Sequence, residues 1–376
     1  MCKDWVDHFA AASFIGRPID HKQRYHGRSQ NRLRKNAMRR ALTLLATIVV
    51  LFAVACGGPA APRAETDDVR ISKGFGILYL PLYVIEHEKL LEKHARAAGL
   101  GEIKTTWLTI DGGNVINDAM LTGRLDIAGI GAPGFITLWA KAKGNPKLEV
   151  VALSAMSATS LYLNTNNPRI KTLRDFTAND RIAIPGIKTS LSAVVLQMIV
   201  AKEFGPQNFD KLDSLTVGLP HPEALIALTS GKTEVNSHFG SPPFSYLELN
   251  DPKVHRVVNS VDALGNITLD LVYAPRRFVE ANPKMTAAFI AAMDEASAII
   301  ANDRKKTMAI FIAGSPVKVS EPDLERMLQD PDTRFSAVPD GVMRFAAFMH
   351  QVGSIKLLPE SWKDMFVPLL HDRAGS

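Results

Sequence analysis

Trp107–Lys143 reads WLTIDGGNVINDAMLTGRLDIAGIGAPGFITLWAKAK, and this stretch decides the fold class. Trp107–Ile110 and Leu125–Ile130 are short apolar, β-prone runs, and apolar residues at helical spacing follow each of them. Strands and helices that alternate this closely predict parallel strands joined by crossover helices. In such sheets ligands bind at the loops beyond the carboxyl ends of the strands. Two such loops supply candidate ligand-binding residues: Asp111, Gly112, Gly113, Gly131, Ala132 and Pro133.

The second loop also matches a dinucleotide-binding pattern. Gly129–Gly134 has the spacing GxGxxG, and Glu149 follows at about the 20-residue distance of the fingerprint. Glu149 opens the next apolar run, however, so it stands at the wrong end of a strand to hold a ribose. Pro133 also removes an N–H group from the turn. We therefore favour a small-ligand loop at a helix N-terminus, with a tight turn that binds nothing as the alternative.

Charge is distributed unevenly along the chain of 376 residues, which is long enough for two domains. Ten basic residues against three acidic ones give residues 1–40 a charge of +7, so residues 41–376 carry −1 of the total of +6. The main part of the chain therefore lacks the basic footprint of a nucleic-acid-binding protein. Cys2 and Cys56 are the two cysteines, and their number and spacing predict neither a disulfide framework nor a zinc site.

The N-terminal region has the pattern of an export signal. Met38-Arg39-Arg40 precedes an uncharged run at 41–55, which is too short to span a bilayer comfortably and is typical of a secretory signal. The run ends in Ala53-Val54-Ala55, directly before Cys56. This resembles a bacterial lipoprotein box, although Ala53 stands where Leu is usual. We expect a signal peptide at 38–55 and lipidation of Cys56, with ordinary cleavage at the same site as the alternative.

Two segments flank this signal. Residues 1–37 are expected to be a mis-annotated leader, in which case Met38 is the true start, or a disordered leader. A short basic cytoplasmic arm is the alternative. Residues 56–68 are rich in Pro, Ala and Gly and are expected to form a tether.

Further loops of small and polar residues follow other predicted strands. A second set of strands and helices, with strands at 181–184, 215–219 and 234–238, repeats the architecture of the first. A strand at 267–273 is expected to return to the first lobe, followed by packing helices. We expect lobe I at 69–157 and 265–376, and lobe II at 158–264. These loops add the candidate ligand-binding residues Gly76, Tyr79, Ser157, Thr159, Lys188, Thr189, Ser190, His221, Gly240 and Ser241.

The chain contains no familiar catalytic or metal-binding motif. HExxH, GxSxG, P-loop and CxxC patterns are absent, and no carboxylates are paired at a useful spacing. His221, between two prolines, is more often structural in such a setting, and His238 suits a role within the fold as well as one at a ligand. Asp111 is a possible base, although an Asp before Gly-Gly is usually a turn residue. We therefore expect no enzyme, cofactor or metal. Gly, Ser and Thr loops at helix starts bind small anionic or polar molecules instead, and Lys188 adds one positive charge.

Several of these segments together resemble one known family. The leader, Gly74–Tyr79, Asp111–Asn114, Asp126–Gly134, Leu153–Leu163 and Pro185–Ser190 are similar to the periplasmic solute-binding proteins of nitrate/sulfonate/taurine-type ABC importers. That superfamily also includes binding proteins for a thiamine pyrimidine precursor. The resemblance covers about 69–258. It implies an α/β fold of the two-lobe periplasmic-binding-protein type II (Venus-flytrap), with a ligand cleft between the lobes and a helical C-terminal part.

The resemblance also implies a function and partners. It points to a monomer that is lipid-anchored outside the cytoplasm, captures a small anionic or polar solute such as a sulfonate, taurine or nitrate, and delivers it to an ABC permease with its ATPase subunit. The alternatives are a neutral heteroaromatic solute, such as a thiamine pyrimidine precursor, and an enzyme on the same fold.

Overall fold

The computed structural model describes residues 65–376. The expected leader, signal peptide, lipidation site Cys56 and most of the tether lie outside the described residues. The last residues of the expected tether are held against the folded part, because Glu65 accepts the backbone N–H groups of Lys284 and Met285 at 3.0 and 2.9 Å. A carboxylate is favourable there because these N–H groups begin a helix.

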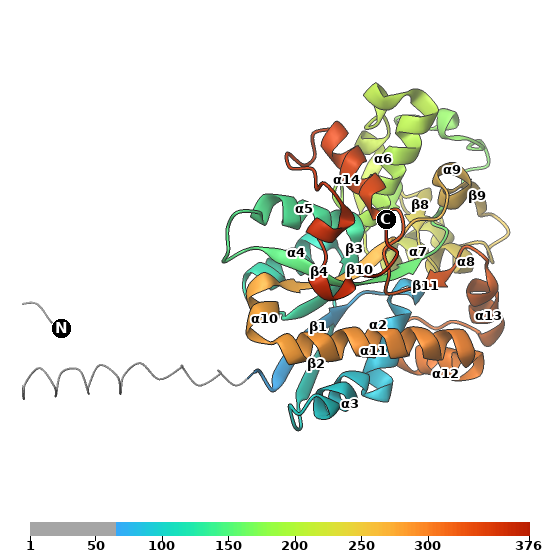
Figure 1. Cartoon of the computed structure of the whole chain (residues 1–376). Coiled ribbons are helices and arrows are strands. Elements are labelled where there is room, and N and C mark those ends of the chain that lie inside the picture. Colours follow the sequence, from blue (N-terminus) through green and yellow to red (C-terminus); the bar gives the residue numbers. More distant parts are fainter. Residues whose placement is uncertain (1–64) are drawn as a thin grey trace, which may run out of the picture. The chain divides into compact units, whose positions relative to one another are not determined.

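Two β-sheets flanked by helices form this part of the chain (Figure 1). The first sheet has the order β11-β4-β10-β3-β1-β2. Its strands are β1 (Asp68–Lys73), β2 (Lys104–Thr109), β3 (Ile127–Gly131), β4 (Val150–Ala158), β10 (Asp270–Pro275) and β11 (Arg334–Phe335). The second sheet has the order β7-β6-β8-β5-β9. Its strands are β5 (Tyr162–Thr165), β6 (Ile182–Ile184), β7 (Thr216–Gly218), β8 (Ser237–Gly240) and β9 (His255–Asn259).

The direction of β10 differs from the parallel arrangement that the sequence predicts. β1 pairs in parallel with β2 and β3, as expected, whereas β10 is antiparallel to both β3 and β4. The chain reaches β10 from the second sheet, so this strand enters the first sheet at the end where β3 leaves it. Asp270, the first residue of β10, therefore pairs with Gly131, the last residue of β3. This register places Asp270 among the loops at the carboxyl end of the sheet.

The helices cover the sheets and fill the C-terminal part of the chain. They are α2 (Leu80–Glu88), α3 (Leu90–Ala97), α4 (Gly113–Leu121), α5 (Ala132–Ala142), α6 (Leu191–Phe204), α7 (His221–Ser230), α8 (Phe244–Glu248), α9 (Ser260–Leu264), α10 (Arg276–Ala281), α11 (Pro283–Asn302), α12 (Arg304–Gly314), α13 (Glu321–Gln329) and α14 (Val342–Gln351). Short 3-10 helices are η1 (Ile77–Tyr79), η2 (Leu173–Asp175), η3 (Pro206–Asn208), η4 (Asp213–Leu215), η5 (Trp362–Asp364) and η6 (Pro368–Leu370). Within residues 65–376, no helix combines the length and apolar character that crossing a membrane requires.

Helix α6 shows how local signals fix an element. Its sequence predicts a helix over Leu191–Phe204, and the structure has these bounds. The Ser190 hydroxyl accepts the N–H of Ala193 at 3.2 Å, which caps the start, and Gly205 ends the helix at φ 91°. The helix is apolar nearly all round, and Val194–Val200 is buried throughout, so α6 lies in the interior of the second lobe.

Pro81, with Leu82, Ile85 and Leu90 on one face, predicts a single helix from Pro81 to about Leu91, and this prediction is wrong. The structure has two helices, α2 and α3, because Lys89 between them adopts a left-handed conformation with φ 52°. Leu90 and Leu91 are both buried. Both leucines therefore reach the core from the first turn of α3.

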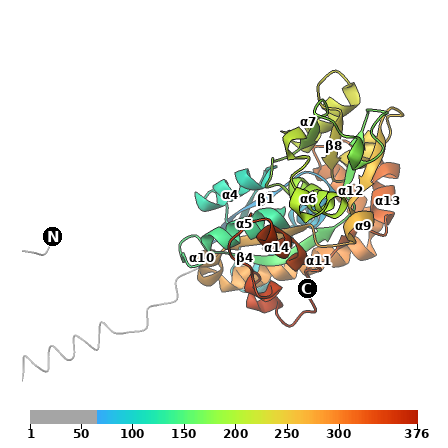
Figure 2. The same cartoon turned by 90° about the horizontal axis from the view of Figure 1, so that it is seen from above.

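The two sheets and their helices form two lobes, which we name the first and the second lobe after their sheets. Figure 1 and Figure 2 both show α6, α7, β8 and α9 gathered on one side, and β1, β4, α10 and α11 on the other. The chain passes from the first sheet to the second between β4 and β5, and returns between β9 and β10. Loops of both sheets meet between these groups.

Candidate ligand-binding site

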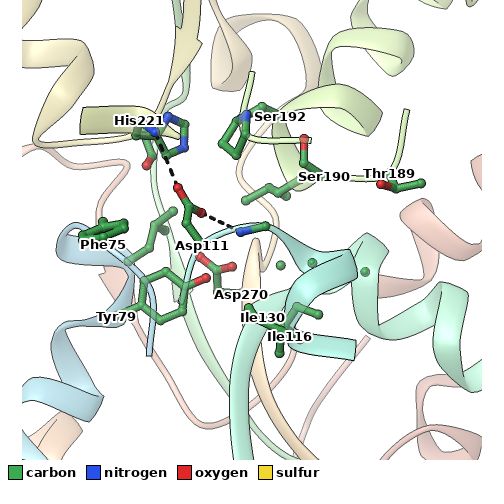
Figure 3. Close-up of a pocket in the computed structure, with 18 of the residues that line it drawn as sticks. Phe75, Tyr79, Asp111, Ile116, Ile130, Thr189, Ser190, Ser192, His221 and Asp270 are labelled. Carbon is green, nitrogen blue, oxygen red and sulfur yellow. Dashed lines mark hydrogen bonds between the residues drawn. The ribbon is translucent and has the colours of Figure 1, made fainter. Parts of the chain in front are cut away.

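A pocket lies where the loops of the two lobes meet (Figure 3). The space between its lining atoms, including the part that is open to solvent, is about 550 Å³. The first lobe lines it with Phe75, Leu78, Tyr79, Asp111, Gly112, Gly113, Ile116, Ile130, Gly131, Gly134 and Asp270. The loop between the sheets and the second lobe line it with Leu161, Pro185, Thr189, Ser190, Leu191, Ser192, His221 and Ser241.

The pocket brings together many of the residues that the sequence singles out. The candidate ligand-binding residues that line it are Tyr79, Asp111, Gly112, Gly113, Gly131, Thr189, Ser190, His221 and Ser241. They come from loops on both lobes. The juxtaposition is a structural fact, whereas a contact between these residues and a ligand stays a prediction.

Other candidates lie beside the pocket and serve the surrounding structure. Gly76 approaches the second lobe, since a Cβ there would stand 2.6 Å from the carbonyl oxygen of Pro242. The N–H of Ala132 is bonded to Leu269 O at 2.7 Å, so it is not free for a ligand. Pro133 is buried in the first turn of α5. Gly240 is packed against the ring of its neighbour His238.

Three further candidates lie away from the pocket. Ser157 lines a separate cavity beside β11, and the Thr159 hydroxyl bonds Thr333 Oγ1 at 2.9 Å. Lys188 is exposed, with φ 65°, and does not line the pocket. The positive charge that the sequence places in this loop therefore does not reach the pocket wall in this structure.

Asp111 lies in the loop after β2 and connects the two lobes. Its Oδ1 accepts the N–H of Gly112 at 2.9 Å, and its Oδ2 accepts the backbone N–H of His221 at 3.5 Å. Both bonds favour the ionised carboxylate, but burial outweighs them and raises the pKa of Asp111 above its ordinary value. The residue is therefore more than the turn residue that its place before Gly-Gly indicates.

Asp270 is the charged residue of the pocket that the sequence analysis misses. It is 1% exposed, and its Oδ2 has no hydrogen-bond partner among the residues that the structure describes. Burial, followed by the charge of Asp111, raises the pKa of Asp270 to about 7. The sequence does contain a signal for Asp270, which is a charged residue within the apolar run 267–273. A carboxylate is rarely placed in a buried strand without a function.

The charge of the pocket is negative or neutral. Burial, and then the charges of Asp270 and Asp111, raise the pKa of Tyr79, whose hydroxyl points toward Asp270 in Figure 3. Burial lowers the pKa of His221 well below its ordinary value, with His238 as the second cause, so His221 is uncharged at neutral pH. The lining residues include no Lys or Arg. Two carboxyl groups thus face the pocket without a positively charged side chain.

A buried chain of hydrogen bonds holds His221 in place. His221 Nδ1 lies 2.8 Å from His238 Nε2, and His238 Nδ1 is paired with Glu248. The second oxygen of Glu248 accepts the side-chain amide of Asn164 at 2.8 Å. His221 also stacks on Phe244, with ring centroids 5.3 Å apart. His238 and Glu248 therefore orient His221 and do not themselves line the pocket.

Helix starts contribute polar groups to the same pocket. Helices α4, α6 and α7 begin at Gly113, Leu191 and His221, all of which line it. The Ser190 oxygen already accepts a bond from α6, so the hydroxyl retains its hydrogen for a ligand acceptor. The pocket thus combines acidic groups with N–H and O–H donors, which suits a ligand with more than one kind of polar group.

Comparisons with known proteins find solved structures with a similar fold. No protein-family description matches the chain, and no curated protein matches it in sequence. The nitrate-binding protein NrtA from Synechocystis PCC 6803 superposes with a TM-score of 0.61 at 13% identity, over 80% of this chain and 84% of that chain. The alkanesulfonate-binding protein SsuA from Xanthomonas axonopodis pv. citri, bound to MOPS, gives 0.59 at 19% identity, over 79% and 96%.

A third structure is a Candida albicans gene product whose description assigns it the generic periplasmic binding protein structural fold. It gives a TM-score of 0.58 at 12% identity, over 78% of this chain and 92% of that chain. Identities this low carry information about the fold only. The two-lobe α/β architecture that the sequence predicts is confirmed, and the chain has the fold of periplasmic binding proteins.

Proposed function

We propose that this protein is the extracytoplasmic solute-binding component of an ABC importer. The observation that carries the proposal is the pocket between the two lobes, since its wall is complete only when loops from both lobes are in place. Such a site binds a solute by closing and releases it by opening. In this proposal the first lobe comprises 69–157 and 265–376, and the second lobe 158–264.

Contacts around the pocket rim support a closing movement. Ile77 N–H donates to Pro242 O at 3.3 Å, and Asp111 accepts from His221 N–H across the same gap. A Cβ at Gly131 would lie 2.8 Å from Leu191 Cβ, so the lobes touch there as well. These contacts lie at the pocket rim, and others join the lobes elsewhere, such as the ring pair of Phe209 and Phe348 and the hydrogen bond from Tyr246 to Asp330. The rim contacts suit lobes that separate and meet again as a solute leaves and enters.

The names of the similar structures support a small polar solute. One is described as binding nitrate and another as binding alkanesulfonates. The proposed partners are the permease and ATPase subunits of an importer. Anchoring through a lipid on Cys56 and a monomeric state belong to the same proposal.

An enzyme on this fold is the competing function. Covalent catalysis needs a nucleophile that is bonded to a base. Across 65–376, no serine, threonine or cysteine side chain is hydrogen-bonded to a histidine, and His221 is bonded to His238 instead. This arrangement favours binding without reaction.

Native mass spectrometry and small-angle scattering test the proposal together. The full chain, purified without denaturation, is expected to retain a solute, and removal followed by re-addition of that solute should lower the radius of gyration. An unchanged radius at saturating solute would contradict the closing movement. Conversion of the solute into a product during incubation would favour the enzyme.

A further inference from the structure

We infer that the solute carries a positively charged nitrogen, such as an ammonium or amidinium group, which Asp111 and Asp270 bind. This inference rests on the proposed solute-binding function and specifies the chemistry of its ligand. It starts from Asp270, because this side chain is 1% exposed, lines the pocket and has an oxygen without a partner within the described part of the chain. A buried acceptor left without a partner is costly, so a partner is expected from outside the chain.

The surroundings of Asp270 explain why the missing partner is cationic. Figure 3 shows the carboxyl group of Asp111 next to that of Asp270 in the pocket wall, and the charge of Asp111 is one of the causes that raise the pKa of Asp270. Two carboxylates that face each other without a cation between them repel, whereas a shared cation removes the repulsion and satisfies both. The pocket wall supplies no such cation, because neither Lys nor Arg lines it.

The groups that face this pair from neighbouring elements do not supply the charge either. Tyr79 on η1 points its hydroxyl toward Asp270 and is neutral at pH 7, since burial raises its pKa. His221 on α7 is held neutral by burial and by His238 behind it. The charge of His238 lowers the pKa of Asp111, but His238 is paired with Glu248 and lies outside the pocket wall. Lys188 on the neighbouring loop is exposed and outside the pocket wall.

The aromatic wall of the pocket suits the same ligand. Phe75 and Tyr79 lie on the side of Asp111 and Asp270 in Figure 3. Aromatic rings attract cations through their electron-rich faces, and a cation near buried carboxylates gains from both interactions. The start of α6 and the hydroxyls of Thr189 and Ser190 lie on the other side of the pocket in Figure 3 and can bind an anionic or polar remainder of the solute. A zwitterion with a sulfonate is therefore compatible, whereas a simple anion faces two carboxylates.

Matched pairs of probes test the charge requirement. The full chain is titrated by calorimetry with taurine and isethionate, tyramine and tyrosol, and cadaverine and pentanediol, in which each first member has an ammonium group where the second has a hydroxyl. We expect the ammonium member to bind roughly 10- to 100-fold more tightly in at least one pair, since a hydrogen bond between charged partners is the stronger kind. Equal or tighter binding of the hydroxyl members, or no binding of any ammonium probe, overturns the inference.

The pH dependence of binding is a second readout. Asp270 must lose its proton to bind a cation, and the probe amines stay protonated up to about pH 9. Affinity for the ammonium probe should therefore rise between pH 5.5 and 8, by up to about tenfold for each unit below the pKa of Asp270 near 7. Affinity that falls with rising pH would show that a protonated carboxyl binds an anion, and would overturn the inference.

Variants separate this result from a general effect of charge. Asp270→Asn should abolish the preference for ammonium, and Asp111→Asn, which keeps acceptor oxygen for the His221 N–H, should weaken it. Asp118→Asn on the exposed side of α4 is the matched control and should change nothing. Melting curves show whether each variant is folded.

If an anion without nitrogen binds and closes the lobes, the proposed function stands and this inference fails. If neither ammonium probes nor anions bind and no solute is retained, both fail.

Discussion

The backbone N–H of His221, at the start of α7, donates to the Asp111 carboxylate across the gap between the two lobes, with N and O 3.5 Å apart. The bond is long for its type, so it is weak in this conformation. It stands next to the pocket, and Asp111 is at the same time one of the two acidic groups in the pocket wall. A change in the charge or position of Asp111 therefore affects both the ligand and the contact between the lobes.

Replacing Asp111 should separate these two roles. Asp111→Ala removes the inter-lobe bond and the charge, so we expect a larger radius of gyration without ligand and weaker solute binding. Asp111→Asn keeps an oxygen for His221, so the radius should stay close to that of the parent while binding weakens. Small-angle scattering and calorimetry measure the two effects. If Asp111→Ala has both the radius and the affinity of the parent, the bond does not contribute to closure.

Gly131 is a position where side-chain volume should prevent closure. Its backbone has φ −60° and ψ 136°, which any residue can adopt, but a Cβ would stand 2.8 Å from Leu191 Cβ on the second lobe. We expect Gly131→Ala to lower solute affinity by roughly 5- to 30-fold, the equivalent of about 1–2 kcal/mol of overpacking. The free energy of unfolding should change little, because the lobes can stay apart. Gly218→Ala is the control, since a Cβ there meets only Ile187 at 3.9 Å. Equal affinity of both variants would place the closed interface elsewhere.

Much of the fold can be predicted because its signals are local. The bounds of α6 follow from a capping Ser190, a long apolar run and Gly205, all of which are neighbours in the sequence. The strand expected at 234–238 is less accurate, since β8 begins at Ser237. Residues 231–236 carry turn bonds such as that from Val235 N–H to the Thr233 hydroxyl, which compete with strand pairing.

The acidic pair is the part of the site that sequence reasoning could not find. Asp111 and Asp270 are far apart in the chain, and neither has a neighbouring carboxylate that would signal a pair. Their proximity depends on β10 returning from the second lobe and pairing Asp270 with Gly131. That register is a property of the tertiary fold, so the loops that carry Asp111 and Gly131 were predictable, whereas the position of Asp270 beside them was not.

Cys56 lies outside the described residues, and its lipidation is open to a direct test. We expect Cys56 to be the first residue of the mature chain and to carry lipid, because it follows an uncharged run that ends in Ala-Val-Ala. The intact mass of the protein from the membrane fraction measures this. Cys56→Ser should release the protein from the membrane without affecting solute binding, and deletion of 1–37 should leave export unchanged. Unmodified Cys56 in a soluble exported chain would refute the anchor but not the export.

Lys188 is the positive charge that the sequence analysis assigns to an anion-binding site, whereas the pocket wall itself carries acidic groups. The side chain is exposed and does not line the pocket, so Lys188→Ala should change solute affinity by less than about threefold and with little salt dependence. Calorimetric titrations at low and high salt measure this. A large loss of affinity at low salt that shrinks at high salt would show that Lys188 reaches an anionic group of the solute.

The stability of the protein without ligand should depend on the ionisation of Asp270. Its folded-state pKa of about 7 is above the ordinary value of an aspartate near 4, so the folded state holds a proton that the unfolded chain releases. Ionisation of Asp270 therefore leaves stability unchanged below about pH 4 and lowers it as the pH rises from 4 to 7, by up to about 1.4 kcal/mol per pH unit. The total loss is up to about 4 kcal/mol, and no further loss occurs above pH 7.

Asp270→Asn removes this titration while keeping the shape of the side chain. We expect the variant to match the parent near pH 4.5 and to be more stable at pH 8 by an amount of up to about 4 kcal/mol, in urea unfolding of the protein freed of solute. The exposed Asp118→Asn variant should show no such difference between the two pH values. If Asp270→Asn stabilises the protein equally at pH 4.5 and pH 8, ionisation of Asp270 costs no stability, and another group already neutralises its charge. If the extra stability of Asp270→Asn at pH 8 disappears when an ammonium solute is added, the carboxylate of Asp270 binds that solute. The same carboxylate then destabilises the protein only while the pocket is empty.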